Sequence, residues 1–333
     1  MNTLKLRYLS LADVLEVGLT MADVIQMVEA VLVEHGHNRF ENPPKPGVHP
    51  LPDAFIHAMP GYLPDKKSCG LKWVSGFSSN ERFEVPAIMG LIVLNDVNTG
   101  QPLAIMDGSY ITAVRTAAVS AVAARHLARK NVETIGMVGA GIQGRYHLLS
   151  FKEVLPDIKR LKIYDHVPAA VDRFKTVLAE SLPPRFDVCE TMQDVFRGAD
   201  IVITATGKLD DRIFRLDWLE PGMLALPIHT RGWEQAVIAG ADKFVVDDWG
   251  QFSTVMGGRN GYYAPLPAAP YAQLGEIVVG LKPGRENDAE KIINFNFGMA
   301  IHDIHAATAV LQKAEARGIG QMLPFLDAGM PFS

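Results

Sequence analysis

The sequence predicts an α/β protein in which a Rossmann-type, doubly wound parallel sheet is joined to an α+β domain. From about residue 132 onward, continuous apolar runs alternate with helical stretches, a pattern typical of a parallel sheet covered on both faces. The glycine-rich segment GAGIQG directly follows the first of these runs. Before about residue 115, short β-like runs are separated by turn residues, which favours a sheet built from hairpins.

The composition limits the classes of function. With 333 residues, 48% of them hydrophobic, the chain is long enough for two domains with large cores. A formal net charge of -5 gives no reason to expect nucleic acid or an anionic membrane as a partner. No window of about 18 uninterrupted apolar residues is present, so no membrane span is expected. Two cysteines without a CxxC pattern, and histidines without metal-ligand spacing, predict no zinc site and a reducing cytoplasmic location.

Helix signals mark three parts of the chain. Residues from about Ser10 to about Asn38 are predicted to form two short helices, with Ser10 and Thr20 as N-cap residues. A long alanine-rich helix begins near Asp107 or Ser109. A last helix near the C-terminus closes the chain, and we expect it to pack back on the first part.

These elements divide the chain into two domains. We predict that residues 1–115 together with 303–333 form the α+β domain. Residues 116–302 then form the Rossmann domain, because the alternation of strands and helices falls within them.

The glycines of GAGIQG have the spacing of a dinucleotide-binding loop. Gly139, Gly141 and Gly144 follow a strand-like run and precede a helical stretch, which is the context that this motif requires. One glycine makes the tight turn, the second lets the backbone approach a pyrophosphate, and the third lets helix and strand pack closely. The helix N-terminus then presents N–H groups to the phosphates. The cofactor contacts predicted here are Gly139, Ala140, Gly141, Ile142, Gln143 and Gly144.

Two further segments are candidates for the same nucleotide. Asp165 ends the second strand-like run, where a carboxylate can bind the adenosine ribose and repel a 2′-phosphate, which favours NAD over NADP. The alternative is that Asp165 only caps the next helix. Thr204, Ala205 and Thr206 end a later strand, where ligands of such folds bind. The alternative for them is an ordinary turn.

Arg115 is a charged residue in an otherwise apolar helical stretch. No acid lies three or four positions away, so the guanidinium needs a partner from elsewhere. A carboxylate of a ligand would suit it, because arginine can bind a carboxylate with two parallel hydrogen bonds. The alternative is a structural ion pair with an acid distant in sequence.

Lys72 lies in the β-like run CGLKWVSGF. Strand alternation places it on one face with Gly70 and Val74, and Leu71 and Trp73 on the other. If the first face is enclosed, the amine has a lowered pKa and can relay protons. The alternative is a lysine that faces solvent.

The chain resembles the ornithine cyclodeaminase/mu-crystallin family over nearly its whole length. Several motifs in the same order carry the resemblance: MPGYL (59–63), GLKWVSGF (70–77), DGSYITAVRTAA (107–118), VGAGIQG (138–144), LGEIVVGLKPGR (274–285) and FGMAIHD (297–303). The resemblance implies that the α+β domain binds the substrate and forms a homodimer, and that Lys72 and Arg115 hold the substrate carboxylate. It also implies that Asp303 and the segment 296–299 lie near the cofactor.

Further site residues are predicted on the strength of this resemblance. Met59 is assigned to the substrate, and Thr116, Phe297 and Gly298 to the cofactor. Lys45 stands where the family often has an arginine, and a lysine can still meet a carboxylate, although as a point charge.

The loop after the fifth strand departs from the family pattern. Cyclodeaminases and alanine dehydrogenases carry an aspartate there, whereas this chain reads ALPIHTRGWEQ. His229, Arg231 and Glu234 are the candidates to replace it; we assign His229 to catalysis and Arg231 to the substrate. Ornithine is disfavoured as a substrate, because its second amine would lose the expected carboxylate.

The function that these residues predict is an NAD(H)-dependent oxidoreductase acting on the C–N bond of a small amino or imino acid, either an amino-acid dehydrogenase or an imine or ketimine reductase. One alternative is an ornithine cyclodeaminase-type ammonia lyase that uses NAD catalytically. Another is a non-catalytic protein that binds nicotinamide and a small carboxylate, as the mu-crystallin branch does.

Overall fold

A computed structural model describes residues 3–207, 209, 211–229, 231–257 and 261–326. The chain forms two compact units. Unit 1 comprises residues 1–27, 39–115 and 299–333, and unit 2 comprises residues 28–38 and 116–298. The predicted division placed residues 28–38 with the first domain and 299–302 with the second, so the structure assigns both segments differently. Thr230 of the predicted substrate loop, and the terminal residues 1–2 and 327–333 of the first domain, lie outside the described residues.

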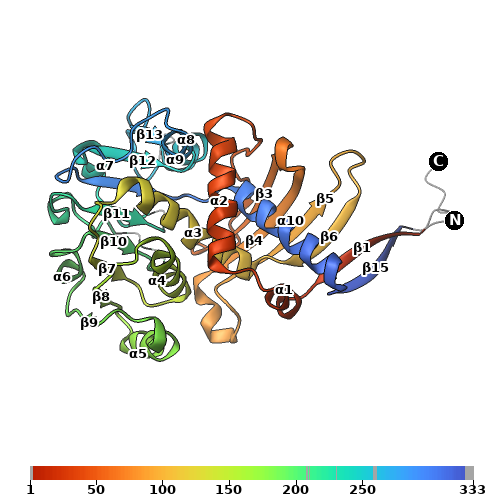
Figure 1. Cartoon of the computed structure of the whole chain (residues 1–333), viewed down its shortest axis with the longest axis horizontal. Coiled ribbons are helices and arrows are strands. Elements are labelled where there is room, and N and C mark those ends of the chain that lie inside the picture. Colours follow the sequence, from red (N-terminus) through yellow and green to blue (C-terminus); the bar gives the residue numbers. More distant parts are fainter. Residues whose placement is uncertain (1–2, 208, 210, 230, 258–260, 327–333) are drawn as a thin grey trace. The chain divides into compact units, whose positions relative to one another are not determined.

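Unit 1 contains a seven-stranded sheet in the order β15-β1-β6-β5-β4-β3-β2 (Figure 1). Among the described strand pairs of this sheet, β1–β6 alone is parallel. The strands are β1 (Leu4–Leu9), β2 (Gly47–Val48), β3 (Ala54–Leu63), β4 (Ser68–Phe77), β5 (Ile88–Asn95), β6 (Pro102–Asp107) and β15 (Gln321–Leu326). The hairpins expected between residues 54 and 107 are present, whereas β1 and β15 were not predicted, because their pairing joins distant ends of the chain.

The helices of the N-terminal segment agree with their sequence signals. In α1 (Leu11–Val17), the Ser10 side chain caps the first turn in a capping box with Asp13. At the start of α2 (Met21–Gly36), Thr20 Oγ1 accepts a hydrogen bond from the Asp23 N–H at 3.1 Å. The prediction of two short helices with these caps is therefore confirmed.

The last helix, α10 (Ala300–Arg317), lies across β3, β4 and β5, as predicted (Figure 1). Its apolar face covers the sheet, and a Cβ on Gly61 of β3 would lie only 3.0 Å from the Ile301 side chain, so the helix packs closely on the strand there. Asn42 Oδ1 accepts a hydrogen bond from the first helical N–H, that of Ala300, at 2.9 Å. Two short 3₁₀ helices, η1 (Pro64–Lys66) and η2 (Ser78–Phe83), complete the regular structure of this unit.

Unit 2 contains an eight-stranded sheet in which every pair is parallel, in the order β13-β12-β14-β11-β10-β7-β8-β9. The strands are β7 (Thr134–Val138), β8 (Arg160–Tyr164), β9 (Arg185–Val188), β10 (Ile201–Thr204), β11 (Leu224–Pro227), β12 (Lys243–Val246), β13 (Ala272–Gln273) and β14 (Ile292–Phe295). The central strands are buried on both faces, which explains their continuous apolar sequences. The predicted fold class is confirmed.

Helices alternate with these strands (Figure 1). They are α3 (Ser109–Leu127), α4 (Ile142–Val154), α5 (Pro168–Val177), α6 (Met192–Phe196), α7 (Ala236–Gly240), α8 (Trp249–Met256) and α9 (Leu274–Val278), with η3 (Ala179–Ser181) and η4 (Leu216–Trp218). The start of α3 is fixed by Asp107, whose carboxylate accepts from the N–H groups of Ser109 and Tyr110. The sequence did not predict β9, β13 or β14, and β14 enters the sheet between β11 and β12.

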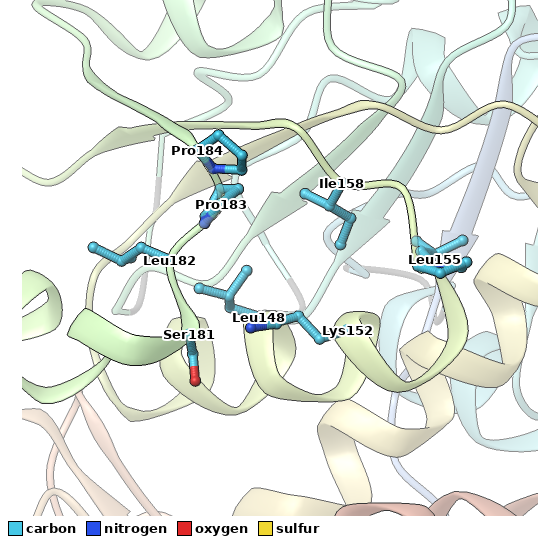
Figure 2. Close-up of a pocket in the computed structure, with 9 residues that line it drawn as sticks. Leu148, Lys152, Leu155, Ile158, Ser181, Leu182, Pro183 and Pro184 are labelled. Atoms are coloured by element: carbon cyan, nitrogen blue, oxygen red, sulfur yellow. The ribbon is translucent and has the colours of Figure 1, made fainter.

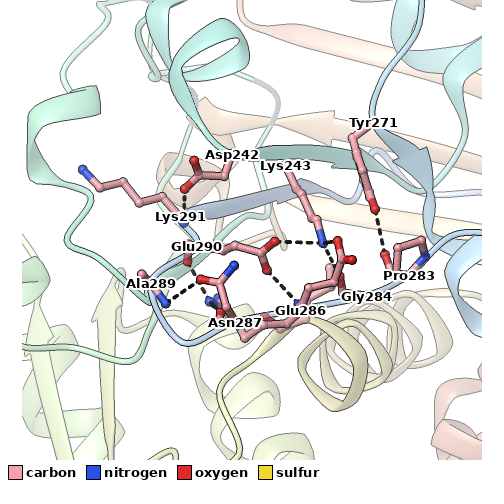
Figure 3. Close-up of polar contacts among 12 residues, drawn as sticks. Asp242, Lys243, Tyr271, Pro283, Gly284, Glu286, Asn287, Ala289, Glu290 and Lys291 are labelled. Atoms are coloured by element: carbon pink, nitrogen blue, oxygen red, sulfur yellow. Dashed lines mark hydrogen bonds and ion pairs between the residues drawn. The ribbon is translucent and has the colours of Figure 1, made fainter.

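The motif LGEIVVGLKPGR and the loop after it make polar contacts within unit 2. Lys243 is at the start of β12. Its Nζ donates to Glu286 Oε2 at 2.7 Å and lies 3.0 Å from Glu290 Oε1 (Figure 3). Arg285 donates from Nε to the carbonyl of Leu127, the last residue of α3, at 2.8 Å. Arg285 thus joins the end of the motif to the end of α3, and the loop after the motif is held against β12 by Lys243.

Among the described residues, no helix is both long enough and apolar enough to cross a membrane.

Candidate active site

Lys72 lies inside unit 1, on the face of β4 that α10 covers. It stands opposite Met59 of β3, in the register Met59↔Lys72, and is 1% exposed. Its ammonium group donates to Asp303 Oδ2 at 2.7 Å and to Thr112 Oγ1 at 3.4 Å. The prediction of an enclosed face is confirmed, and the alternative of a solvent-facing lysine is wrong.

Arg115 lies on α3 and shares the same acid. Its Nε donates to Asp303 Oδ1 at 2.9 Å, so each oxygen of this fully buried carboxylate pairs with one cation. The Nε of Arg115 thus forms the structural ion pair with an acid distant in sequence that was the alternative for this residue. The two terminal nitrogens of the guanidinium are not used in this pair and can bind a carboxylate side by side.

Burial and charge set the protonation of these groups. Burial lowers the pKa of Lys72 to about 7; Asp303 opposes that shift and Arg115 adds to it. Burial acts to raise the pKa of Asp303, but Arg115 and Lys72 outweigh it and hold that pKa below its ordinary value. Lys72 can therefore gain and lose a proton near neutral pH while Asp303 stays ionised.

Asp303 was not among the predicted site residues, and the resemblance placed it near the cofactor. In the structure it is the shared counterion of Lys72 and Arg115. An isolated acid on the apolar face of the last helix is the sequence signal that corresponds to it.

In unit 2, the three motif glycines meet three different steric requirements. Gly139 has φ +110°, and a Cβ on it would lie 2.4 Å from the carbonyl oxygen of Ala205. A Cβ on Gly144 would lie 2.4 Å from the carbonyl oxygen of Gly139, so helix and loop pack closely there. Gly141 has open space beside it and is the N-cap of α4, without a side-chain cap. This arrangement fits a pyrophosphate bound to the backbone N–H groups of the helix start.

Asp165 adjoins this loop at the end of β8. Its Oδ2 accepts from the Ala140 N–H at 2.8 Å, and its Oδ1 accepts from the Val167 N–H at 2.9 Å. The second bond lies just before α5, so the alternative of helix capping describes part of its role. The first bond orders the glycine loop, which brings the carboxylate to the place where the ribose of a dinucleotide is expected.

The three predicted cofactor contacts at the end of β10, Thr204, Ala205 and Thr206, have different surroundings. The Thr204 side chain is fully buried, and its hydroxyl accepts from the indole N–H of Trp233 at 3.1 Å. The Thr204 side chain is therefore part of the core of unit 2. Ala205 lies against Gly139, and the Thr206 hydroxyl donates to the neighbouring Gly207 carbonyl at 3.1 Å.

The predicted cofactor contacts after β14, Phe297 and Gly298, are positioned by residues of unit 2. Gly298 has φ +92°, and its N–H donates at 2.6 Å to Asp247, which directly follows β12. The half-buried Phe297 packs against Phe252 in an edge-to-face arrangement at 6.3 Å. Of the other predicted contacts, Ile142 is exposed on α4, and Gln143 and Thr116 are half-buried.

The loop after β11 supplies no free carboxylate. Burial lowers the pKa of His229 to about 4, and its ring stacks on Phe214 at 5.7 Å, so this imidazole is neutral near pH 7. Arg231 lies over the Tyr262 ring at 5.4 Å. The carboxylate of Glu234 pairs with Arg215 and accepts from the Leu216 N–H at 3.4 Å.

A surface pocket of unit 2 is lined by none of the predicted site residues. It is lined by Leu148 and Lys152 of α4 and by the segments 155–158 and 181–184 (Figure 2). The glycine loop is at the opposite, N-terminal end of α4. The pocket is lined mainly by leucine, isoleucine and proline, and its polar side chains are Lys152 and Ser181. Within the described part of the chain, no group of three or more His, Cys, Asp or Glu side chains is placed to hold a metal ion.

A glycine loop that follows a strand of a parallel sheet and leads into a helix defines the class of dinucleotide-binding proteins. The model of the ornithine cyclodeaminase/mu-crystallin family matches residues 7–318. The chain belongs to this family, and the family prediction is confirmed.

Two relatives match almost the whole chain. The nodulation efficiency protein NfeD of Rhizobium meliloti is 37% identical over 321 residues, which are 96% of this chain and 98% of the relative. The N-((2S)-2-amino-2-carboxyethyl)-L-glutamate dehydrogenase of Staphylococcus aureus is 33% identical over 330 residues, which are 95% of this chain and 97% of the relative.

Two solved structures share the fold and hold the cofactor. The Thermococcus litoralis Delta(1)-pyrroline-2-carboxylate reductase, in complex with NADH and L-proline, superposes with a TM-score of 0.85 at 29% identity, covering 95% of this chain and 99% of that one. An archaeal alanine dehydrogenase dimer with bound NAD gives 0.84 at 29% identity, covering 97% and 100%. The predicted nicotinamide cofactor agrees with both.

The position of Asp165 yields a test of nucleotide preference. Asp165→Asn keeps an acceptor for the Ala140 N–H but removes the charge that repels a 2′-phosphate. We expect wild type to bind NADH more tightly than NADPH. In the variant, the ratio of the association constant for NADH to that for NADPH should fall by about tenfold. Nucleotide fluorescence titration measures both constants.

Asp172→Asn, an exposed position on α5, is the matched control and should leave the ratio unchanged. An unchanged ratio in Asp165→Asn would remove Asp165 from the nucleotide site.

Proposed function

We propose that this protein is an NAD(H)-dependent oxidoreductase that acts on the C–N bond of a small amino or imino acid. The observation that carries the proposal is the buried trio of Lys72, Arg115 and Asp303, a site with two cations for one internal anion. The family membership and the dehydrogenase and reductase activities named for relatives support the same reaction class.

In this proposal the chain's own residues bind the substrate and supply the proton. The terminal nitrogens of Arg115 and the ammonium of Lys72 bind the substrate carboxylate. A nicotinamide dinucleotide held at the glycine loop of residues 139–144 would supply or accept the hydride at the substrate carbon. In the reductive direction, Lys72 gives a proton to the substrate nitrogen; in the oxidative direction it takes one. Asp303 is a positioning residue that fixes both cations.

The loop after β11 favours a reductase over a cyclodeaminase. A cyclodeaminase must bind the second amine of a diamino acid, and a carboxylate is the natural partner for that amine. Here His229 is neutral, Arg231 is cationic, and Glu234 is already paired with Arg215. We therefore keep ornithine cyclodeamination, and the carrier function without turnover, as outcomes of the test.

We also propose that the protein works as a homodimer through unit 1. The face of its sheet opposite α10 carries exposed apolar side chains, and Trp73 and Leu91 are neighbours in the β4–β5 register, each 47% exposed. Tyr8 and Leu103 extend this apolar face on β1 and β6. The archaeal alanine dehydrogenase is a dimer, which supports the proposal. Both cysteines, Cys69 and Cys189, are free thiols, which is in keeping with a cytoplasmic location.

The test of the reaction is the absorbance of NADH with purified protein. The panel contains 2-keto acids with ammonia or methylamine, and cyclic imino acids. We expect at least one member to oxidise NADH, and the accepted side chain identifies the substrate. A flat trace across the panel contradicts the proposal; ammonia release from a diamino acid without net NADH would then identify a cyclodeaminase, and NADH binding alone a carrier.

The pKa of Lys72 makes the reductive activity depend on pH. Because the protonated amine is the donor, kcat/KM for reduction should fall about tenfold for each pH unit above about 7. Lys72→Arg keeps a cation but cannot release its proton, so its residual activity should lack this fall. A fall that persists in Lys72→Arg would belong to the substrate or another group, and would exclude Lys72 as the donor.

A further inference from the structure

Arg145 lies in the first turn of α4, directly after the last glycine of the dinucleotide motif. Its backbone N–H donates to the carbonyl of Gly141, the N-cap residue, at 3.1 Å, so this bond closes the turn. The side chain is half-buried, and no aspartate or glutamate lies in the same turn. Arg145 is therefore a cation at the end of the helix where the backbone N–H groups and the helix dipole favour an anion.

The guanidinium of Arg145 has no acidic partner in the described part of the chain. Its Nε is buried, and no acceptor among the described residues meets it. A buried N–H group of a cation is unfavourable without an acceptor, so this side chain is suited to an anion from outside the protein. Among the other arginines of unit 2, the following pair with an acid: Arg125, Arg129, Arg160, Arg185, Arg197 and Arg215.

Helix geometry directs this side chain toward the glycine loop. Side chains of an α-helix lean toward its N-terminus, so we expect the guanidinium of Arg145 to extend over the turn that begins at Gly141. Beside Gly141 the space is open, and this N-cap has no side-chain cap. The second glycine of the motif is where the backbone approaches a pyrophosphate, which is the anionic part of a nicotinamide dinucleotide. The unpaired cation and the expected anion thus belong to the same helix end.

We propose that Arg145 binds the pyrophosphate of the nicotinamide dinucleotide through its guanidinium. Arginine suits this role, because two of its N–H groups can bind two oxygens of one phosphate. Arg145 then adds affinity for NADH and NADPH alike, since both contain the pyrophosphate, whereas Asp165 distinguishes between them. The inference concerns nucleotide binding alone, so it does not rest on the proposed C–N oxidoreduction and is measured without turnover.

Fluorescence titration of NADH and NADPH into variants of α4 tests the proposal. Arg145→Met should raise the Kd for both nucleotides by the same factor, about tenfold, as the loss of a charge-assisted hydrogen bond predicts. Arg145→Lys keeps the charge without the fork and should stay within about threefold of wild type. Lys152→Met removes an exposed cation from the last turn of the same helix, and this matched control should bind both nucleotides as wild type does.

An unchanged Kd for NADH in Arg145→Met would overturn the proposal. A rise in the Kd for NADPH alone would also overturn it, because Arg145 would then bind a 2′-phosphate. The urea midpoint of the nucleotide-free protein separates binding from packing: an unpaired cation near a helix N-terminus is unfavourable, so Arg145→Met should unfold at a midpoint no lower than that of wild type. At equal NADH concentration, wild type should gain more stability than the variant. A lower midpoint without nucleotide, with the full gain from NADH, would show a packing role only.

The two proposals can fail separately. NADH binding that depends on Arg145, together with a flat NADH trace across the keto-acid and imino-acid panel, would contradict only the oxidoreductase activity. NADH oxidation by a member of the panel, with the Kd for NADH of wild type retained in Arg145→Met, would contradict only the role of Arg145.

Discussion

The ion pairs of the Asp303 carboxylate are the interaction on which the candidate active site depends. Lys72 is 1% exposed, and a buried amine without a counterion would lose its proton at neutral pH. Arg115 binds the other oxygen of the same carboxylate, so α3, α10 and β4 are fixed to one another at this point. Because one anion serves two cations, the site keeps an excess of positive charge for a substrate carboxylate. The pKa of Lys72 near 7 is a consequence of the same balance.

The glycine loop of residues 139–144, where the dinucleotide is expected, depends on steric constraints and not on ion pairs. At Gly139 and Gly144 the backbone of a neighbour occupies the place of a side chain, while Gly141 is open at the uncapped start of α4. Asp165 orders this loop through the Ala140 N–H. The same parallel sheet holds the segment after β14 through the bond from Gly298 to Asp247. Cofactor binding is thus built from local sequence signals, which is why it could be predicted.

The sequence predicted what is local and missed what depends on distant pairing. The glycine motif, the caps of α1 and α2, and the alternation around Lys72 are short-range patterns, and the structure agrees with each. The strand pair β1–β15 and the insertion of β14 join segments far apart in the chain, which periodicity does not reveal. For the same reason Arg115 could be recognised as a cation in need of a partner, but Asp303, 188 positions away, could not be identified as that partner. The hydrogen bond between Thr204 and Trp233 joins two segments 29 positions apart, so it too could not be predicted from local patterns.

The free energy of unfolding of Asp303→Asn, from urea denaturation, tests the central claim most directly. Removal of this charge leaves Lys72 and Arg115 buried without a counterion, so we predict a loss of about 3 kcal/mol relative to wild type. Asp65→Asn removes an exposed acid paired with Arg39 and should cost less than about 1 kcal/mol. If Asp303→Asn were as stable as Asp65→Asn, the buried carboxylate would not be what holds the two cations, and this account of the active site would be contradicted.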